Sequence, residues 1–270
     1  MDEERLEGGN LNASVVRVGE TVRRESGPWT PAVHHLLNHL EERSYPAPRP
    51  FGLDGSGREV LSYVPGEPIH PDNLHLIDTP DAMERVGHLI AGYHQAQADY
   101  QPPSDAIWRH EGRDPTGSTE ILAHNDLSPW NLIAGPNGWV FIDWDLAAPG
   151  RRMWDLAWAL HSFVGLWPDS TRSHPEIAER IAAFCKGADV DAHSRPELLE
   201  TVIERTEQHS AFLREQAATG HPTYQRMVNV GHADRWEQGS SHVRTHAEHW
   251  ISLLNPASDG TLHGPISGRP

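Results

Sequence analysis

The pattern of hydrophobic and polar positions divides the chain into a strand-rich beginning and a helix-rich remainder. Residues 14–24 alternate β-branched and polar side chains around Gly19-Glu20, which predicts two short strands joined by a tight turn. Thr30-Pro31 then supplies a helix start. The apolar residues after it recur on one helical face: Val33, Leu36, Leu37 and Leu40. Residues 59–64 predict a further strand, which must stop at Pro65-Gly66.

Beyond this point helical periodicity dominates. Thr79-Pro80 opens one helix, and Ser173 and Ser194 open two more with capping-box spacing. A last helix is expected over residues 224–254. Residues 131–143 form two apolar runs around Gly135-Pro-Asn-Gly138, which is typical of a hairpin. We therefore expect two lobes and a tail: a β-rich N-lobe with one helix over residues 1–65, a helical C-lobe over 66–255, and a disordered segment over 256–270.

Composition narrows the classes of partner and compartment. The formal net charge of -16 repels nucleic acid and anionic membranes but favours a cationic substrate. One cysteine, Cys185, excludes an internal disulfide, and the acidic N-terminus differs from a secretory signal. The chain has no run of about twenty apolar residues. These features predict a cytoplasmic protein that neither enters membranes nor binds nucleic acid.

The candidate chemistry gathers around the predicted hairpin. Asp126 precedes Asn131 by five residues, and Asp143 ends the second strand, so the hairpin returns all three side chains to one point. A carboxylate that takes the proton of an acceptor hydroxyl, together with hard oxygen ligands for Mg²⁺, is what phosphoryl transfer requires. Asp126 is the candidate base, and Asn131 and Asp143 are the candidate metal ligands. His124 is a further catalytic candidate, although a histidine at this position more often braces a loop.

His124-x-Asp126-x4-Asn131 and the later Ile142-Asp143-Trp144-Asp145 resemble the aminoglycoside-phosphotransferase family, a kinase-like family with choline and homoserine kinases as relatives. The similarity spans roughly residues 8–163 and includes Gly8-Gly9, the segment EVLSYVPGE (59–67) and Arg152-Met-Trp-Asp155-Leu-Ala157. It implies an α+β, protein-kinase-like two-lobed fold, with ATP or GTP and Mg²⁺ held between a small β-rich N-lobe and a larger, mainly helical C-lobe.

The resemblance also implies particular binding residues. Ser62, Tyr63 and Val64 would form the hinge that holds the nucleotide base, and Asp155 would brace the catalytic loop. A kinase normally binds the α- and β-phosphates with a lysine on its third strand, paired with a glutamate of the next helix. The only lysine is Lys186, so we assign the phosphate contact to Arg23, with Arg24 as the alternative. Val33 occupies the position expected for the glutamate.

Several residues carry weaker expectations. Asp145 binds substrate or metal, or braces its loop. Asp169, Glu204 and Glu207 are surface candidates for receiving a cationic acceptor. His242, His246 and His249 have helical spacing suited to a metal, but a solvated face is favoured and no metal is assigned. For the tryptophans, core packing is favoured over a substrate pocket: Trp144, Trp154 and Trp158.

The sequence thus predicts a Mg-dependent kinase that phosphorylates a hydroxyl of a small, aminoglycoside-like antibiotic or metabolite. Two alternatives fit parts of the pattern. A catalytically degenerate, nucleotide-binding regulatory protein would lack the lysine, and a metal-dependent hydrolase would also use a His/Asp/Asn cluster. A protein kinase is disfavoured because no Ala-Pro-Glu follows Asp143.

Overall fold

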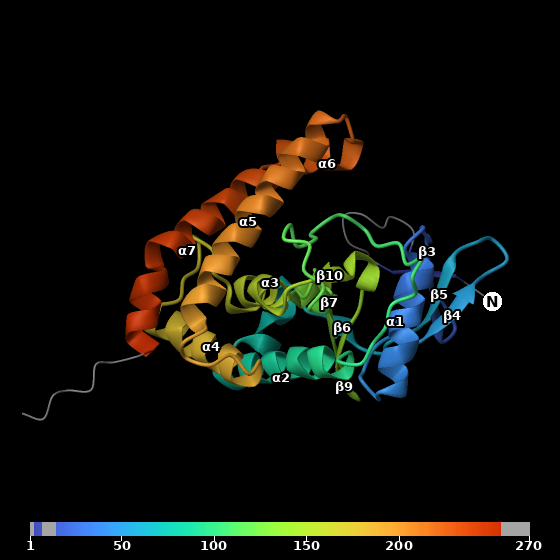
Figure 1. Ribbon diagram of the computed structural model, residues 1–270, viewed down its shortest axis with the longest axis horizontal. Helices are drawn as coiled ribbons and strands as arrows, with labels where there is room; N and C mark the ends of the chain where they lie inside the picture. The colour runs from blue at the N-terminus through green and yellow to red at the C-terminus, as the bar shows by residue number, and fades with distance from the viewer. Residues whose placement is uncertain (1–2, 7–14, 255–270) are drawn as a thin grey trace, which may run out of the picture.

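The N-terminal part of the molecule is an antiparallel sheet flanked by one helix. The computed structural model describes residues 3–6 and 15–254, so Gly8-Gly9 and the predicted tail lie outside the described residues. The five strands lie in the order β1-β2-β3-β5-β4. Their bounds are β1 (Glu4–Arg5), β2 (Val16–Val18), β3 (Thr21–Arg24), β4 (Pro50–Leu53) and β5 (Glu59–Ser62). Helix α1 (Thr30–Glu42) lies beside this sheet and buries the predicted apolar face (Figure 1).

The rest of the chain is mainly helical and contains two small sheets, of order β6-β8-β9 and β10-β7. Its elements are β6 (Glu67–Pro68), η1 (Pro71–Ile77), α2 (Pro80–Ala96), β7 (Ile121–Ala123), η2 (Pro129–Asn131), β8 (Leu132–Gly135), β9 (Gly138–Phe141), η3 (Trp144–Leu146), β10 (Ala148–Gly150), α3 (Arg152–Val164), α4 (His174–Gly187), α5 (Arg195–Ala218), α6 (Pro222–Asn229) and α7 (His232–Leu254). The boundary proposed near residue 65 falls between β5 and β6, which belong to different sheets.

Most of the predicted helix and strand signals are found in place, and the exceptions have local causes. The Thr79 side chain accepts a hydrogen bond from the N–H of Ala82, and Ser173 forms its capping box with Glu176. Ser194 makes no such cap. The single helix expected over residues 224–254 is two helices, because Gly231 takes a φ of +83°, which interrupts a right-handed helix.

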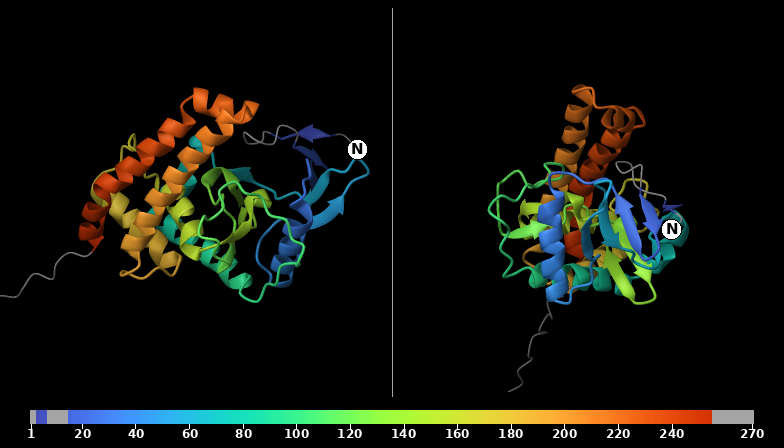
Figure 2. Two further views of the ribbon diagram at one scale, coloured as in Figure 1. Left: turned by 45° about the horizontal axis from the view of Figure 1, so that its top comes forward. Right: turned by 90° about the vertical axis from the view of Figure 1, so that its right-hand side faces the viewer.

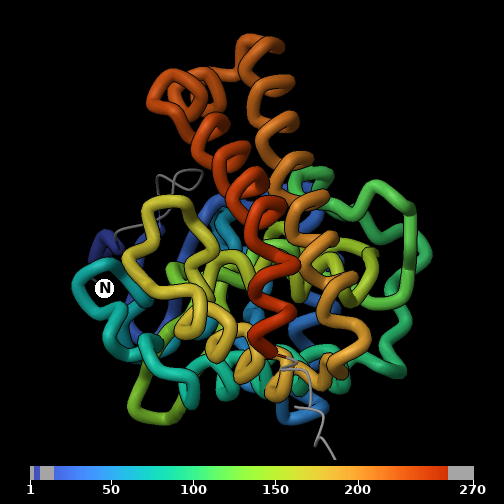
Figure 3. Tube along the Cα trace, turned by 90° about the vertical axis from the view of Figure 1, so that its left-hand side faces the viewer, coloured from blue at the N-terminus to red at the C-terminus, as the bar shows by residue number. Residues whose placement is uncertain are grey.

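Helices α5 and α7 run side by side along one flank of the C-lobe, with α6 at their projecting end (Figures 2 and 3). Both pack close to α3, which carries Asp155 and Trp158 behind the predicted catalytic loop. Among the described residues, no helix combines the length and apolarity needed to cross a membrane.

One buried histidine makes this packing sensitive to pH. His161 of α3 is 0% exposed and lies against Trp167 and Trp236, at ring-centroid distances of 4.3 and 5.2 Å. Neither of its ring nitrogens has a hydrogen-bond partner. Burial, with repulsion from His242 and Arg235, lowers the pKa of His161 to about 3. The unfolded chain, with a histidine pKa near ~6.5, therefore takes up this proton first, and stability falls between pH ~6.5 and about 3.

Replacing His161 with leucine should remove this contribution to the pH dependence. Between pH ~7.5 and ~5 the free energy of unfolding should fall in both proteins, but by about 2 kcal/mol less in His161→Leu than in the wild type. Urea denaturation at the two pH values measures the difference. The exposed His75→Leu serves as the control and should keep the wild-type slope. Identical pH slopes for His161→Leu and the wild type would contradict the assignment.

Candidate active site

The predicted catalytic loop follows β7, which presents His124, Asn125 and Asp126 at the end of its sheet. Asn125 takes a φ of +65°, a conformation that asparagine tolerates better than most residues. The turn η2 then brings Asn131 back, and its Nδ2 donates to Asp126 Oδ2 at 2.8 Å. The spacing of five residues thus closes a small loop with the two side chains in contact.

Asp126 is surrounded by neutral donors. Besides Asn131, Ser128 Oγ donates to its Oδ1 at 3.1 Å and Trp158 Nε1 at 3.0 Å. Burial, and secondarily the charge of Asp143, raises the pKa of Asp126, while the contacts of His124, Ser128 and Trp158 lower it. A carboxylate held by hydrogen bonds beside a second carboxylate is suited to accept a proton from a hydroxyl.

His124 lies behind this loop. Its Nδ1 accepts the N–H of Asp126 at 3.2 Å, so its Nε2 carries the proton and donates to the carbonyl of Ile142 at 3.2 Å. The residue is 0% exposed and its ring packs on Trp144. Burial lowers its pKa, which favours the neutral form. Both nitrogens bind backbone, which is the geometry of a loop brace, and a catalytic role for His124 stays a prediction.

The strongest charge cluster of the site joins the two lobes. Arg24 at the end of β3 donates to Glu59 of β5 at 2.5 Å, to Asp143 at 2.6 Å and to Asp145 at 2.6 Å. Its side chain is 7% exposed, and that of Asp143 is 38% exposed. Burial raises the pKa of Asp145 to about 7, against the attraction of Arg24. Arg24 thus faces the two carboxylates that follow β9.

Arg23 occupies the opposite face of the same strand, because successive side chains of a strand alternate. Its guanidinium lies 3.5 Å from Asp54, a residue of the β4–β5 turn, and not beside Asp143. Of the two arginines, Arg24 and not the preferred Arg23 contacts Asp143 and Asp145, and the contact of either with a phosphate stays a prediction. The two neighbours could not be separated from their sequence alone, since the register of a four-residue strand decides which one faces inward.

The partner of this arginine was missed. Glu59, 1% exposed, holds Arg24, and His34 of α1 approaches the other oxygen of Glu59 at 2.8 Å. Val33 is fully buried in the core and makes no polar contact of this kind. The acidic partner thus comes from the neighbouring strand and not from the helix. A buried glutamate in an apolar strand, at the first residue of EVLS, was the available signal.

The predicted hinge residues follow β5 where the chain leaves the first sheet. Ser62 exchanges hydrogen bonds with Arg49, and the N–H of Tyr63 donates to the carbonyl of Glu20 at 2.9 Å. The guanidinium of Arg17 lies 3.9 Å from the centre of the Tyr63 ring. Ser62, Tyr63 and Val64 are each partly exposed. They lie at the end of β5 and in the segment that connects it to β6 of the next sheet. Their contact with a nucleotide base stays a prediction.

The catalytic loop is held from behind by two buried charges. Asp155 accepts the N–H of Asn125 at 2.9 Å and lies 3.0 Å from Nε2 of His94. Arg205 of α5 donates to the carbonyl of Asn125 at 2.7 Å and to that of Gly112 at 2.8 Å. Asp155 therefore has the geometry of the predicted brace. Arg205 was not anticipated, because a lone arginine in a long polar helix gives no sequence signal.

The donor set at the hairpin fits a hard cation. Asn131 turns its amide nitrogen to Asp126, which leaves its amide oxygen on the other side, and Asp143 offers a carboxylate in a strained left-handed conformation, φ +61°. Amide and carboxylate oxygens are ligands that Mg²⁺ prefers. Within residues 3–6 and 15–254, no group of three or more His, Cys, Asp or Glu side chains is arranged to hold a metal. A cation here would thus need further oxygens, which nucleotide phosphates supply.

The acidic residues considered for a cationic acceptor are engaged in surface ion pairs. Asp169 pairs with Arg235, Glu204 with Arg151 and Glu207 with Arg244. These contacts give the three carboxylates a structural explanation. A cationic acceptor therefore gains no support from them.

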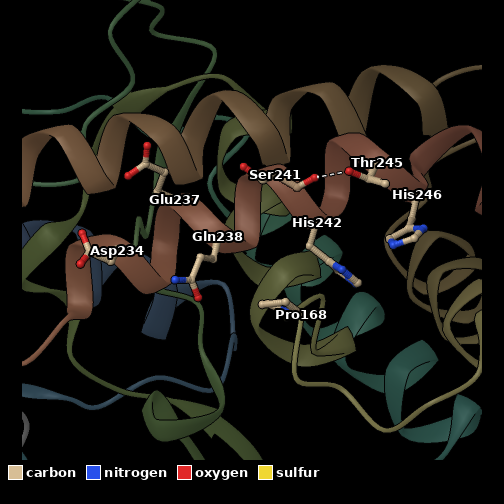
Figure 4. Close-up of a pocket in the computed structure, with 8 residues that line it drawn as sticks. All are labelled: Pro168, Asp234, Glu237, Gln238, Ser241, His242, Thr245 and His246. Atoms are coloured by element: carbon tan, nitrogen blue, oxygen red, sulfur yellow. Dashed lines mark hydrogen bonds between the residues drawn. The ribbon is translucent and has the colours of Figure 1, made fainter.

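A hollow of about 700 Å³ lies along α7, away from the catalytic loop (Figure 4). Its lining is polar and comes from α7 and one loop proline: Pro168, Asp234, Glu237, Gln238, Ser241, His242, Thr245 and His246. Arg214 pairs with both of its carboxylates. The hollow shares no residue with the Asp126 site.

Comparison with known proteins identifies the family of this chain. A model of the phosphotransferase enzyme family, that of the aminoglycoside phosphotransferases, matches residues 3–115 and 106–199. The chain belongs to this family. A trifolitoxin immunity protein of Rhizobium leguminosarum bv. trifolii is 35% identical over 187 residues, which cover 67% of each chain.

Solved structures share the fold. A choline/ethanolamine kinase family protein of Mesorhizobium loti superposes with a TM-score of 0.62 at 15% identity, covering 94% of this chain and 92% of that one. The amicoumacin kinase hAmiN gives 0.61 at 12% identity and 88% of each chain, and an ethanolamine kinase of Plasmodium vivax gives 0.60 at 12% identity, 93% and 84%. The predicted kinase-like two-lobed fold is thereby confirmed.

Removing the carboxylate of Asp155 should destabilise the protein strongly. Asp155→Ala leaves the N–H of Asn125 without its buried acceptor and His94 without its partner, so the free energy of unfolding should fall by about 3 kcal/mol in urea denaturation. The matched control is Asp169→Ala, which breaks an exposed pair with Arg235 and should cost less than about 1 kcal/mol. Equal losses in the two variants would show that Asp155 does not brace the loop.

Proposed function

We propose that this chain is a Mg²⁺-dependent kinase that transfers the γ-phosphoryl group of ATP or GTP to a hydroxyl of a small molecule. The observation that carries the proposal is the pair of contacts that Asn131 makes with Asp126 and Arg24 makes with Asp143. These are the base, metal and phosphate positions that the reaction requires.

In this proposal each side chain has one task. Asp126 orients the acceptor hydroxyl and takes its proton, and the donors around it keep the carboxylate aimed. Asn131 and Asp143 would hold Mg²⁺, which neutralises charge on the phosphate oxygens. Arg24 would take the task of the phosphate-binding lysine of kinases, and its planar guanidinium can bind phosphate through two N–H groups.

The acceptor class is inferred from a relative. Because the trifolitoxin immunity protein is similar over two thirds of its length, we propose that the acceptor is an antibiotic or toxin with a free hydroxyl, and that phosphorylation protects the host cell. This acceptor need not be cationic, because Asp169, Glu204 and Glu207 already form ion pairs with arginines.

A catalytically silent, nucleotide-binding protein is the second candidate. It is favoured by one observation: Arg24 is already bound to three carboxylates, those of Glu59, Asp143 and Asp145, so nucleotide must compete for that arginine. Nucleotide binding without transfer would be its signature.

The test incubates the purified protein with Mg-ATP or Mg-GTP and a panel of hydroxylated antibiotics and metabolites. Transfer to one acceptor class is expected, detected as phosphorylated product by mass spectrometry. Asp126→Asn, which preserves shape but removes the base, should slow transfer by about 10²- to 10⁴-fold while leaving nucleotide affinity within about threefold.

Thr119→Ala, a change at an exposed loop position, is the activity control. Transfer that survives Asp126→Asn unchanged would reject the base assignment. Failure of the wild type to bind either nucleotide would reject the kinase proposal as a whole, and binding without transfer to any acceptor would favour the silent alternative.

A further inference from the structure

The carboxylate of Asp126 has one donor that comes from outside its own loop. Ser128 and Asn131 belong to the catalytic loop and move with it, whereas Trp158 lies on α3. The single indole N–H of Trp158 is shared between Asp126 Oδ1 at 3.0 Å and Ser128 Oγ at 2.8 Å. The contact therefore ties the proposed base to the helical body of the C-lobe.

The indole itself has little freedom to turn. It is 5% exposed, and Trp236 of α7 stacks on it with 4.5 Å between ring centroids and an interplanar angle of 21°. The guanidinium of Arg205 lies 4.9 Å from the ring centre, and His209 meets the ring edge-on at 5.0 Å. Two helices, α5 and α7, thus fix the direction in which the N–H points.

The cation above the ring also strengthens the donor. A guanidinium over an aromatic face draws electron density from the ring system, which makes the indole N–H more positive. The same Arg205 holds the backbone carbonyl of Asn125, next to Asp126. Arg205, Trp158 and Asp126 therefore form a continuous series from α5 to the base.

We propose that Trp158 is a positioning residue, whose indole N–H fixes the rotamer of Asp126 so that the carboxylate faces the acceptor hydroxyl. This inference rests on the proposed function. Small displacements of a catalytic group cost large factors in rate, whereas binding of the nucleotide across the cleft does not depend on this contact. Loss of the N–H should thus lower kcat and leave the KM for nucleotide unchanged.

The contact is first tested in solution without any turnover. Protein labelled with ¹⁵N-tryptophan gives an indole N–H resonance for Trp158, assigned from its loss in Trp158→Phe. In Asp126→Ala this resonance should move upfield, because its charged acceptor is gone. The resonance of Trp250, which donates to His174, should stay in place. Asp126→Asn provides a second variant if alanine disturbs folding. A Trp158 resonance that stays in place in a folded variant would overturn the proposal.

The role is then tested by kinetics. Trp158→Phe keeps an aromatic ring but loses the donor, and should lower kcat by about 10- to 100-fold with the nucleotide KM within about twofold. The matched control is Trp250→Phe, which also removes a buried indole and its hydrogen bond, but on the far part of α7. It should reduce stability while kcat stays near the wild-type value.

The outcomes separate the two proposals. The acceptor is the one that the hydroxyl panel identifies, or water, measured as hydrolysis of Mg-ATP or Mg-GTP. Equal kcat losses in Trp158→Phe and Trp250→Phe, or a loss that appears only in KM, would reduce Trp158 to a packing residue. A wild-type protein without any turnover would reject the proposed function, and the positioning role with it, even if the indole contact is present.

Discussion

The ion cluster around Arg24 is the constraint on which the arrangement of the cleft depends. A buried guanidinium donates hydrogen bonds to three carboxylates, one from the first sheet and two from the segment after β9, with N–O distances of 2.5–2.6 Å. The charges of Arg24, Glu59 and Asp145, whose side chains are all buried, would each be costly to bury alone, so the group is stable only when both lobes contribute. The position of the first sheet against the C-lobe, and hence the distance between Arg24 and Asp126, follows from this requirement.

The loop that carries Asp126 is also held by buried charges, but the groups that contact Asp126 itself are neutral donors. Charges lie one layer deeper, where Asp155 and Arg205 hold the backbone on either side of Asn125. The carboxylate of Asp126, the proposed base, accepts hydrogen bonds from hydroxyl, amide and indole groups. The hydrogen bonds of the charged Asp155 and Arg205 hold the backbone of the loop in place. Because its hydrogen-bond donors are neutral, Asp126 can gain and lose a proton.

The fold and the contact between Asp126 and Asn131 could be predicted from sequence because both depend on local patterns. Hydrophobic periodicity indicated α1 and the 131–143 hairpin, and the Asp-to-Asn interval brought Asp126 and Asn131 into contact. The residues that were missed act through long-range contacts that no local pattern encodes. Glu59 and Arg24 are 35 residues apart, and Arg205 and Asn125 are 80 apart.

The central claim is that Arg24 replaces the missing lysine, and paired nucleotide titrations of Arg24→Met and Arg23→Met test it most directly. Both variants lose one cation from the same strand, but only Arg24 faces the cleft carboxylates. We expect the Kd for Mg-ATP or Mg-GTP to rise by about tenfold or more in Arg24→Met and to change by less than about twofold in Arg23→Met, with folding of both checked by circular dichroism. Unchanged nucleotide affinity in a folded Arg24→Met, or a larger loss in Arg23→Met, would contradict the account.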